Sequence, residues 1–188
     1  MGHKDFKFEA HKGFEACWAQ VMMYHILLSD HYEPETYICS PLRAETVKEK
    51  EMNVSAVRAY MCYAIMKMGQ SATAPHAFLP AVLDDEVPEE RELALQLGLV
   101  ILKKCKRMFV CGSNLSSGML GEIIRAFELG KEIWVFNRGV YGVVKEIAEK
   151  DGYNLNLLMY DNEHRYLSLS AKEIIPHDDD EEVDKDAL

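Results

Sequence analysis

The sequence holds no hydrophobic run that approaches the roughly 18 to 20 residues of a membrane-spanning helix. Its first residues, 1–7, also lack the apolar stretch of a signal peptide. Cysteine is sparse: the five cysteines form no CxxC pair, and three of them lie in apolar segments that resemble core. We therefore expect a cytoplasmic protein that has no membrane segment and works in a reducing compartment.

Positive charge is scarce too. The chain has 21 lysines and arginines against 31 aspartates and glutamates, which gives a formal net charge of −10. This balance argues against a general surface for nucleic acid or for anionic membranes. Much of the excess lies in residues 177–188, where seven acids stand against one lysine. We expect these residues to form a solvated, disordered tail, with docking to a partner as the alternative.

Several motifs that mark catalytic or metal-binding proteins are missing. The sequence contains no Walker motif, no HExxH, no zinc-type spacing of cysteine or histidine and no G-x-S-x-G. We therefore expect neither a metal nor a cofactor. With 188 residues, 48% of them hydrophobic and 28% charged, the chain has the length and composition of one globular domain with extensions at its ends.

Short apolar segments alternate with helical patterns along the middle of the chain. The predicted strands are residues 36–39, 71–74, 108–111, 132–136 and 153–160. The predicted helices are residues 53–68, 88–104, a segment from the loop 112–118 to about 129, and 139–150, followed by a short turn at 170–175. Residues 40–51 are predicted to be a loop and 75–88 an irregular segment. The alternation predicts an α/β domain, residues 35–176, in which a parallel sheet lies between two layers of helices.

Residues 1–34 are expected to form a helical extension. Between 9 and 28, apolar side chains recur at the steps of three and four residues that mark an amphipathic helix: Phe14, Trp18, Val21, Met22 and Ile26. This helix either packs on the domain or forms a dimer contact, because tryptophan, tyrosine and methionine are frequent at interfaces.

Three predicted loops leave strand ends on the same side of the predicted sheet. They are Ser40 to Arg43, Ala74 to His76 and Gly112 to Gly118. Ligands of such sheets bind at the carboxyl ends of the strands. We therefore expect the three loops to converge on one crevice.

The loop 112–118 is the most informative segment. Serine hydroxyls and backbone amides at the start of a helix form an anion-binding site, and Gly118 allows a ligand to approach the backbone closely. Glu122 lies about one turn into the following helix, where the helix N-terminus favours an ionised carboxylate of the kind that acts as a nucleophile. The alternative is that Ser116 or Ser117 caps the helix and Glu122 is a solvated helix residue.

Further polar side chains follow the other strand ends. Arg43 either binds a phosphate or carboxylate or forms a surface ion pair with one of the glutamates between 45 and 51. His76 either contacts a ligand or is a buried structural histidine. The acidic run 84–92 either solvates the start of a helix or supplies one carboxylate to the crevice.

Six segments of the chain carry a resemblance to a known family. They are Tyr37-Ile-Cys-Ser-Pro-Leu-Arg43, Ala74-Pro-His76, Phe78-Leu-Pro-Ala-Val-Leu-Asp-Asp85, Pro88-Glu-Glu-Arg91, Phe109-Val-Cys-Gly-Ser113 and Ser116-Ser-Gly-Met-Leu-Gly-Glu122. Together they resemble the nucleoside 2-deoxyribosyltransferase superfamily, and more narrowly its small, uncharacterised bacterial and phage branch. The resemblance covers about Tyr37 to Phe136, roughly half of the chain.

This resemblance implies a flavodoxin-like fold with about five strands, and a nucleoside, nucleotide or related ribosyl compound as the ligand. It implies that Glu122 attacks the anomeric carbon and that Arg43 and Ser116 hold a 5′-phosphate. The deoxyribosyltransferases carry aspartate in place of Ser116, which favours a phosphorylated ligand here. Asp85 or His76 is expected to contact the leaving base or carry its proton. The other expected binding residues are Tyr37, Ser40, Pro41, Gly112, Ser113, Ser117, Gly118 and Met119.

One position departs from the pattern of the superfamily. Active members carry an aspartate that helps to protonate the leaving base, and the matching position here is Gly98. A general acid contributes typically about 10²–10⁴-fold. The chain is therefore either an N-glycosidase or (deoxy)ribosyltransferase, or a protein that binds a nucleotide without turning it over; a structural or interaction protein is the third alternative. Relatives complete their sites with a neighbouring subunit, so we also expect a homodimer or larger homo-oligomer.

Overall fold

The computed structural model describes residues 34–153, 156–160 and 163–175. The amphipathic helix expected at 9–28 and the acidic tail expected at 177–188 lie outside these residues. The described residues contain four of the five predicted strands in full and all of the fifth except residues 154–155.

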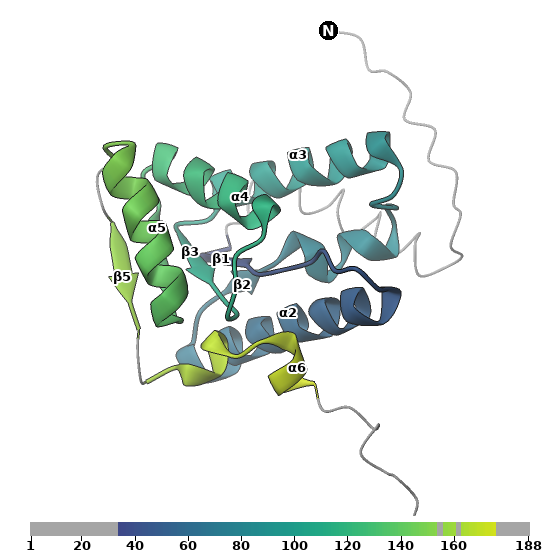
Figure 1. Cartoon of the computed structure of the whole chain (residues 1–188), viewed down its shortest axis with the longest axis horizontal. Helices are drawn as coiled ribbons and strands as arrows, with labels where there is room; N and C mark the ends of the chain where they lie inside the picture. The colour runs from purple at the N-terminus through teal and green to yellow at the C-terminus, as the bar shows by residue number, and fades with distance from the viewer. Residues whose placement is uncertain (1–33, 154–155, 161–162, 176–188) are drawn as a thin grey trace, which may run out of the picture.

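Five parallel strands form the centre of the molecule (Figure 1). They are β1 (Thr36–Cys39), β2 (Ala72–Thr73), β3 (Arg107–Val110), β4 (Glu132–Val135) and β5 (Leu157–Met159). Their order across the sheet is β2-β1-β3-β4-β5, which is the order of flavodoxin-like domains. The predicted α/β class and the parallel sheet of five strands are confirmed, although β2 and β5 are shorter than the predicted segments.

Helices cover both faces of this sheet. They are α2 (Val47–Met68), α3 (Pro88–Lys104), α4 (Ser117–Glu128), α5 (Arg138–Lys150) and the short α6 (Ala171–Ile174). On one face α3 packs on α4 and α4 on α5, whereas α2 packs on α6 on the other (Figure 1). Because the chain steps one way from β1 to β2 and the other way from β2 to β3, right-handed crossovers place α2 opposite α3, α4 and α5.

Side chains that alternate along the strands divide the core into two parts. Tyr37 and Cys39 of β1 pack in the cluster under α3, α4 and α5, whereas Ile38 packs in the cluster under α2. This is the period of two that a strand imposes on its side chains. Tyr37 is fully buried, and its side chain packs in the layer that carries α4.

The helix α2 begins at Val47 rather than at the predicted residue 53. Thr46 caps it, since its hydroxyl accepts a hydrogen bond from the backbone N–H of Glu49 at 3.2 Å. The first turns of α2 are charged and largely exposed, so the apolar period that predicted the helix starts only further along. The loop predicted at 40–51 is therefore wrong over its last residues.

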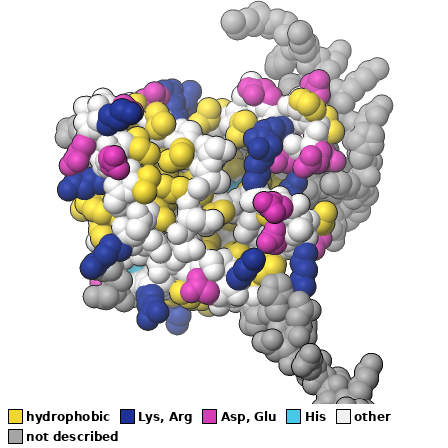
Figure 2. Space-filling model, viewed as in Figure 1, with side chains coloured by type: hydrophobic (Ala, Val, Ile, Leu, Met, Phe, Trp, Pro, Cys, Tyr) yellow, Lys and Arg dark blue, Asp and Glu magenta, His cyan; other side chains and the backbone are white. Residues whose placement is uncertain are grey.

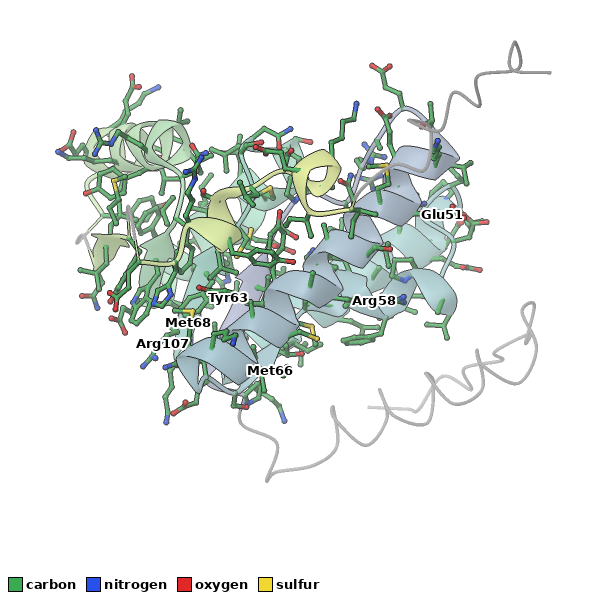
Figure 3. All side chains as sticks on the ribbon, turned by 90° about the horizontal axis from the view of Figure 1, so that it is seen from below. Glu51, Arg58, Tyr63, Met66, Met68 and Arg107 are labelled. Carbon is green, nitrogen blue, oxygen red and sulfur yellow. The ribbon has the colours of Figure 1, made fainter. Side chains whose placement is uncertain are left out.

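Other predicted boundaries are confirmed. Gly69 ends α2 in the left-handed conformation, with φ 64°, and Gly130 follows α4 in the same conformation. Pro88 is the first residue of α3. Arg107 of β3 lies beside Met68 at the C-terminal end of α2 (Figure 3). It donates a hydrogen bond to the side chain of Gln70.

Charged side chains are spread over the surface of the domain. On the face of Figure 2, basic and acidic side chains are intermixed rather than gathered into one patch. Within the described part of the chain, no helix has the length and apolar character that crossing a bilayer requires.

Candidate active site

A pocket opens between α3, the start of α4 and the loops that follow β1 and β2. Its walls contain most of the side chains predicted for the site: Ser40, Arg43, His76, Asp85, Ser116, Gly118, Met119 and Glu122. Leucines from three segments, Leu42, Leu79 and Leu95, add an apolar surface. Glu122 and Arg43, which lie far apart in the sequence, therefore face the same pocket.

Glu122 is fixed by contacts from two other elements. The hydroxyl of Tyr37 on β1 donates a hydrogen bond to Oε1 of Glu122 at 2.7 Å. Gly98 on α3 borders the same two side chains: a Cβ atom at this position would lie 3.4 Å from the Tyr37 hydroxyl oxygen and 3.8 Å from Oε1 of Glu122. The position at which the superfamily pattern has an acid is thus next to the expected nucleophile. Tyr37 itself, predicted to bind substrate, is fully buried and contacts Glu122 instead of lining the pocket.

The protonation of Glu122 differs from the expectation. Burial raises the pKa of its carboxyl, and the hydrogen bond from Tyr37 offsets only part of this effect. The helix N-terminus was expected to keep the carboxylate ionised, but loss of contact with water dominates. The carboxyl therefore ionises at higher pH than an exposed glutamate does.

Ser40 and His76 form a buried pair in the pocket wall. The Ser40 hydroxyl lies 2.8 Å from Nε2 of His76, and both residues are buried. Burial lowers the pKa of His76 to about 4, so the ring is neutral at physiological pH. His76 is thus the buried, hydrogen-bonded histidine of one alternative. It also faces the pocket, and its contact with a ligand stays a prediction.

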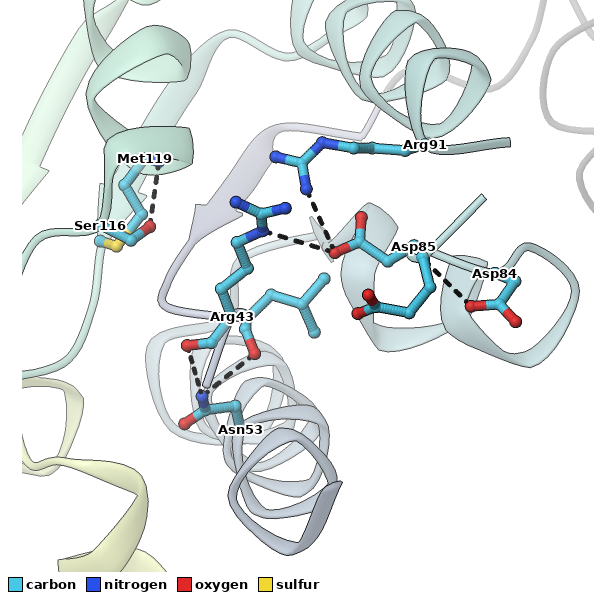
Figure 4. Close-up of polar contacts among 9 residues, drawn as sticks. Arg43, Asn53, Asp84, Asp85, Arg91, Ser116 and Met119 are labelled. Carbon is cyan, nitrogen blue, oxygen red and sulfur yellow. Dashed lines mark hydrogen bonds and ion pairs between the residues drawn. The ribbon is translucent and has the colours of Figure 1, made fainter. Parts of the chain in front are cut away.

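Two arginines converge on one carboxylate at the pocket. Nε of Arg43 and Nη1 of Arg91 each lie 3.6 Å from Oδ2 of Asp85 (Figure 4). Arg43 therefore pairs with Asp85 and not with a glutamate between 45 and 51; Glu49 pairs with Lys172. Asp85, predicted to be a catalytic acid, has the contacts of a counter-ion.

Ser116 caps α4, which is one half of the alternative predicted; the other half, a solvated Glu122, is wrong, because Glu122 is hydrogen-bonded to the buried Tyr37. Its hydroxyl oxygen accepts a hydrogen bond from the backbone N–H of Met119 at 3.3 Å (Figure 4). Ser116 also lines the pocket, and accepting this bond leaves the proton of its hydroxyl free to donate. Ser117 follows it as the first helical residue and is exposed; its side chain is not part of the pocket wall.

The loops predicted to form one crevice border two cavities. Pro41, Gly112 and Ser113 line a second cavity, and Arg43 borders both. The backbone N–H of Gly112 donates to the carbonyl of Leu167 at 2.9 Å, which ties the start of this loop to the α2 side of the sheet. The second cavity is the larger one, about 470 Å³ against about 110 Å³. We place the candidate active site in the first because it holds Glu122.

Sequence reasoning did not single out two charged residues of the pocket, Glu90 and Arg91. Arg91 lies in the first turns of α3 and lines the pocket beside Asp85. The proline that opens α3 predicted where this helix begins, but not that its first turns would face Glu122. Arg91 belongs to the segment Pro88 to Arg91, which carries part of the family resemblance, but the resemblance indicated no role for it.

The cysteines of the described residues are free thiols, three of them buried and one, Cys62, exposed. Cys39, Cys105 and Cys111 are buried free thiols whose pKa is raised by burial, to about 12 for Cys105, so they remain protonated and unreactive. The described part of the chain contains no group of three or more histidine, cysteine, aspartate or glutamate side chains that could hold a metal ion.

Comparisons with known proteins give a family without an assigned activity. A family model described as a domain of unknown function (DUF7768) matches residues 34–136. A solved structure similar to part of the chain is the 2-deoxyribosyltransferase from Bacillus psychrosaccharolyticus, with 22% sequence identity, coverage of 55% of this chain and 72% of that chain, and a TM-score of 0.42. No functionally curated protein matches the chain. Because the family match spans more than half of its residues, the chain belongs to the DUF7768 family.

Proposed function

We propose that the protein cleaves the N-glycosidic bond of a nucleotide or related ribosyl compound, with Glu122 as the nucleophile. The position of Glu122 carries this proposal: its carboxyl faces a pocket, is held by Tyr37 and shares the pocket with Arg43. A carboxylate placed in this way can attack an anomeric carbon, while a guanidinium group in the same pocket can bind an anionic group of the ligand.

The chemistry proceeds in two displacements at the anomeric carbon. In the first, an oxygen of Glu122 bonds to this carbon as its bond to the base nitrogen breaks, and the electron pair leaves with the base, which takes up a proton. In the second, water, or another base in a transferase, attacks the carbon, releases Glu122 and gives up a proton. Positive charge develops on the sugar in both transition states, where the carboxylate stabilises it. Because Tyr37 occupies Oε1, Oε2 is the oxygen left for the sugar.

We take His76 as the residue of the pocket wall that assists the leaving base. Asp85 is engaged by two arginines, and Gly98 has no side chain to offer. His76 is neutral at physiological pH and carries one ring N–H, which can donate a hydrogen bond to the base nitrogen as negative charge develops there. Such a donor is weaker than a carboxylic acid, so we expect slow turnover.

Base release from a panel of nucleoside 5′-monophosphates and the matching nucleosides tests this proposal. The wild-type protein should release free base from at least one compound, and Glu122→Gln should reduce the rate by at least about 10³-fold, since it removes the nucleophile. Glu128→Gln is the matched control, because Glu128 lies on the same helix and pairs with Arg125 on its surface. Base release that persists in Glu122→Gln, or none from any compound, contradicts the proposal.

A second candidate function is binding without turnover. The observation that favours it is Gly98, since the position beside Glu122 at which active relatives are expected to carry an acid is empty of a side chain. Mass spectrometry of small molecules that co-purify with the protein separates the two functions. An intact nucleotide that survives long incubation supports binding alone, whereas free base and sugar phosphate support cleavage.

A further inference from the structure

The group formed by Arg43, Asp85 and Arg91 lies at the pocket but plays no part in the proposed chemistry at the anomeric carbon. We propose that this group is a phosphomonoester site in which Asp85 holds the place of the ligand's phosphate, and that Arg91 is a second phosphate-binding residue. This inference rests on the proposed function for the position of the sugar, and extends it to the class of substrate.

The ion pairs of Asp85 with the two arginines are weak enough for a ligand to replace Asp85. Both guanidinium groups approach the same oxygen, Oδ2 of Asp85, and both distances are 3.6 Å. Hydrogen bonds from N–H to oxygen are shorter, about 2.7–3.2 Å, so these are ion pairs that close no hydrogen bond. Partly exposed pairs of this kind contribute little stability. Replacement of Asp85 by a ligand therefore costs the protein little stability.

Arg91 also has a hydrogen-bond donor that lacks an acceptor within the described residues. Its Nη1 atom is shielded from solvent and has no hydrogen-bond partner within the described part of the chain. Buried donors are nearly always paired in folded proteins, so an acceptor is expected at this position. Asp85 lies in the right direction but too far away to serve as one.

A phosphate matches the two arginines better than a carboxylate does. A phosphomonoester presents three terminal oxygens and up to two negative charges, so each guanidinium group can engage an oxygen of its own. Asp85 offers them one shared oxygen. The three residues come from the loop after β1, the loop before α3 and the first turns of α3, which is how a compact anion is enclosed from several sides.

Charge in the pocket requires that Asp85 move aside. Two arginines face three carboxyl groups in its wall, those of Asp85, Glu90 and Glu122. A dianionic ligand that entered beside Asp85 would meet more negative than positive side chains. If Asp85 turns away, both guanidinium groups become available at once, so Asp85 sets how tightly the phosphate binds.

Titration calorimetry with ribose 5-phosphate and with ribose tests this site. Ribose 5-phosphate lacks a base, so its binding does not depend on cleavage of an N-glycosidic bond. Wild-type protein should bind ribose 5-phosphate and not ribose. Arg43→Gln and Arg91→Gln should each weaken binding by about 10-fold or more, as expected for a lost charged hydrogen bond, whereas Asp85→Asn should tighten it several-fold.

Matched controls exclude a general effect of charge. Arg125→Gln, at a half-buried position, and Glu89→Gln, at an exposed one, change the net charge by the same amounts outside the pocket and should leave the affinity unchanged. Thermal unfolding checks that each variant is folded; if Arg91→Gln is not, Arg91→Lys keeps the charge without the two-pronged geometry and should still weaken binding. An Asp85→Asn protein that binds no tighter than wild type, an Arg91 variant with wild-type affinity, or no binding by either wild type or Asp85→Asn overturns the inference.

The two proposals fail in different ways. Phosphate-dependent binding of ribose 5-phosphate without base release from any nucleotide rejects the proposed cleavage and retains the phosphate site. Base release that is equally fast from a nucleoside and from its 5′-monophosphate, with unchanged rates in Arg91→Gln, retains the cleavage and rejects the phosphate site.

Discussion

The hydroxyl of Tyr37 donates a 2.7 Å hydrogen bond to Oε1 of Glu122, although the two residues lie 85 positions apart in the chain. β1 supplies the donor and α4 the acceptor, because Tyr37 points to the layer of the core that α4 covers. The bond counteracts the rise in pKa that burial causes at Glu122, and it leaves one carboxyl oxygen for a ligand. We therefore propose that Tyr37 positions Glu122.

Removal of the Tyr37 hydroxyl should slow base release while the carboxyl of Glu122 stays in place. In Tyr37→Phe, we expect base release to fall by about 10- to 100-fold, the effect of one hydrogen bond to a charged group. The pKa of Glu122 should also rise further, so the activity should require higher pH than in wild type. Rates measured across pH check both effects. Tyr63→Phe, on the opposite layer, is the control, and an unshifted pH profile in Tyr37→Phe would contradict the positioning role.

Ionisation of Glu122 should cost stability. Its pKa is raised in the folded state, so its contribution to the free energy of unfolding is fully present below the ordinary glutamate value and is lost as pH rises through the raised value. Each unit of that rise corresponds to about 1.4 kcal/mol. At pH 7 the Glu122→Gln protein should therefore be more stable than wild type towards urea, and the gain should vanish in acid. Glu128→Gln should show no such gain.

His76 should make the protein sensitive to acid. Burial lowers its pKa from 6.5 to about 4, so the unfolded chain binds the proton more tightly than the folded protein does. The stability that His76 contributes is present above pH 6.5 and is lost as pH falls towards 4, by at most about 3 kcal/mol. Urea unfolding at several pH values should show a smaller loss in His76→Gln, and the same loss in both proteins would count against the burial of a neutral ring.

An acid installed at position 98 should accelerate cleavage. The Cβ atom fits, since its nearest neighbours would lie 3.4 Å or more away. A carboxyl so close to Glu122 should have a raised pKa and retain its proton near neutral pH. In Gly98→Asp, base release should rise by about 10-fold or more, towards the contribution of a general acid. Gly98→Asn has the same shape without the acid and should show no rise; equal rates in the two variants would mean that the missing acid does not limit turnover.

Local chemistry along the chain predicted the elements well. The apolar run Thr36–Cys39 is a buried strand, Gly69 ends α2 and Pro88 opens α3, because strand burial, a left-handed helix end and a first-turn proline each depend on a few neighbouring residues. The start of α2 escaped prediction for the same reason: Thr46 caps a helix whose first turns carry no apolar period.

The membership of the pocket was predictable only in part. Motif spacing pointed to Arg43, His76 and Glu122, all of which line it. It could not show that Gly112 and Ser113 face a second cavity, because the two sides of the sheet look alike from the chain alone. Nor could it show that Arg91 joins Arg43 on Asp85, since ion pairs form between whichever charges the packing brings close.

The order of residues by itself determined an α/β domain with a parallel sheet and a polar site at the strand ends, because periodicity, capping and apolar runs act over short distances. The tertiary structure alone decided that Tyr37 holds Glu122, that Gly98 borders them both and that Asp85 pairs with two arginines. These relationships depend on how β1, α3 and α4 pack against one another, and packing of elements distant in the chain follows from the whole core rather than from any one segment.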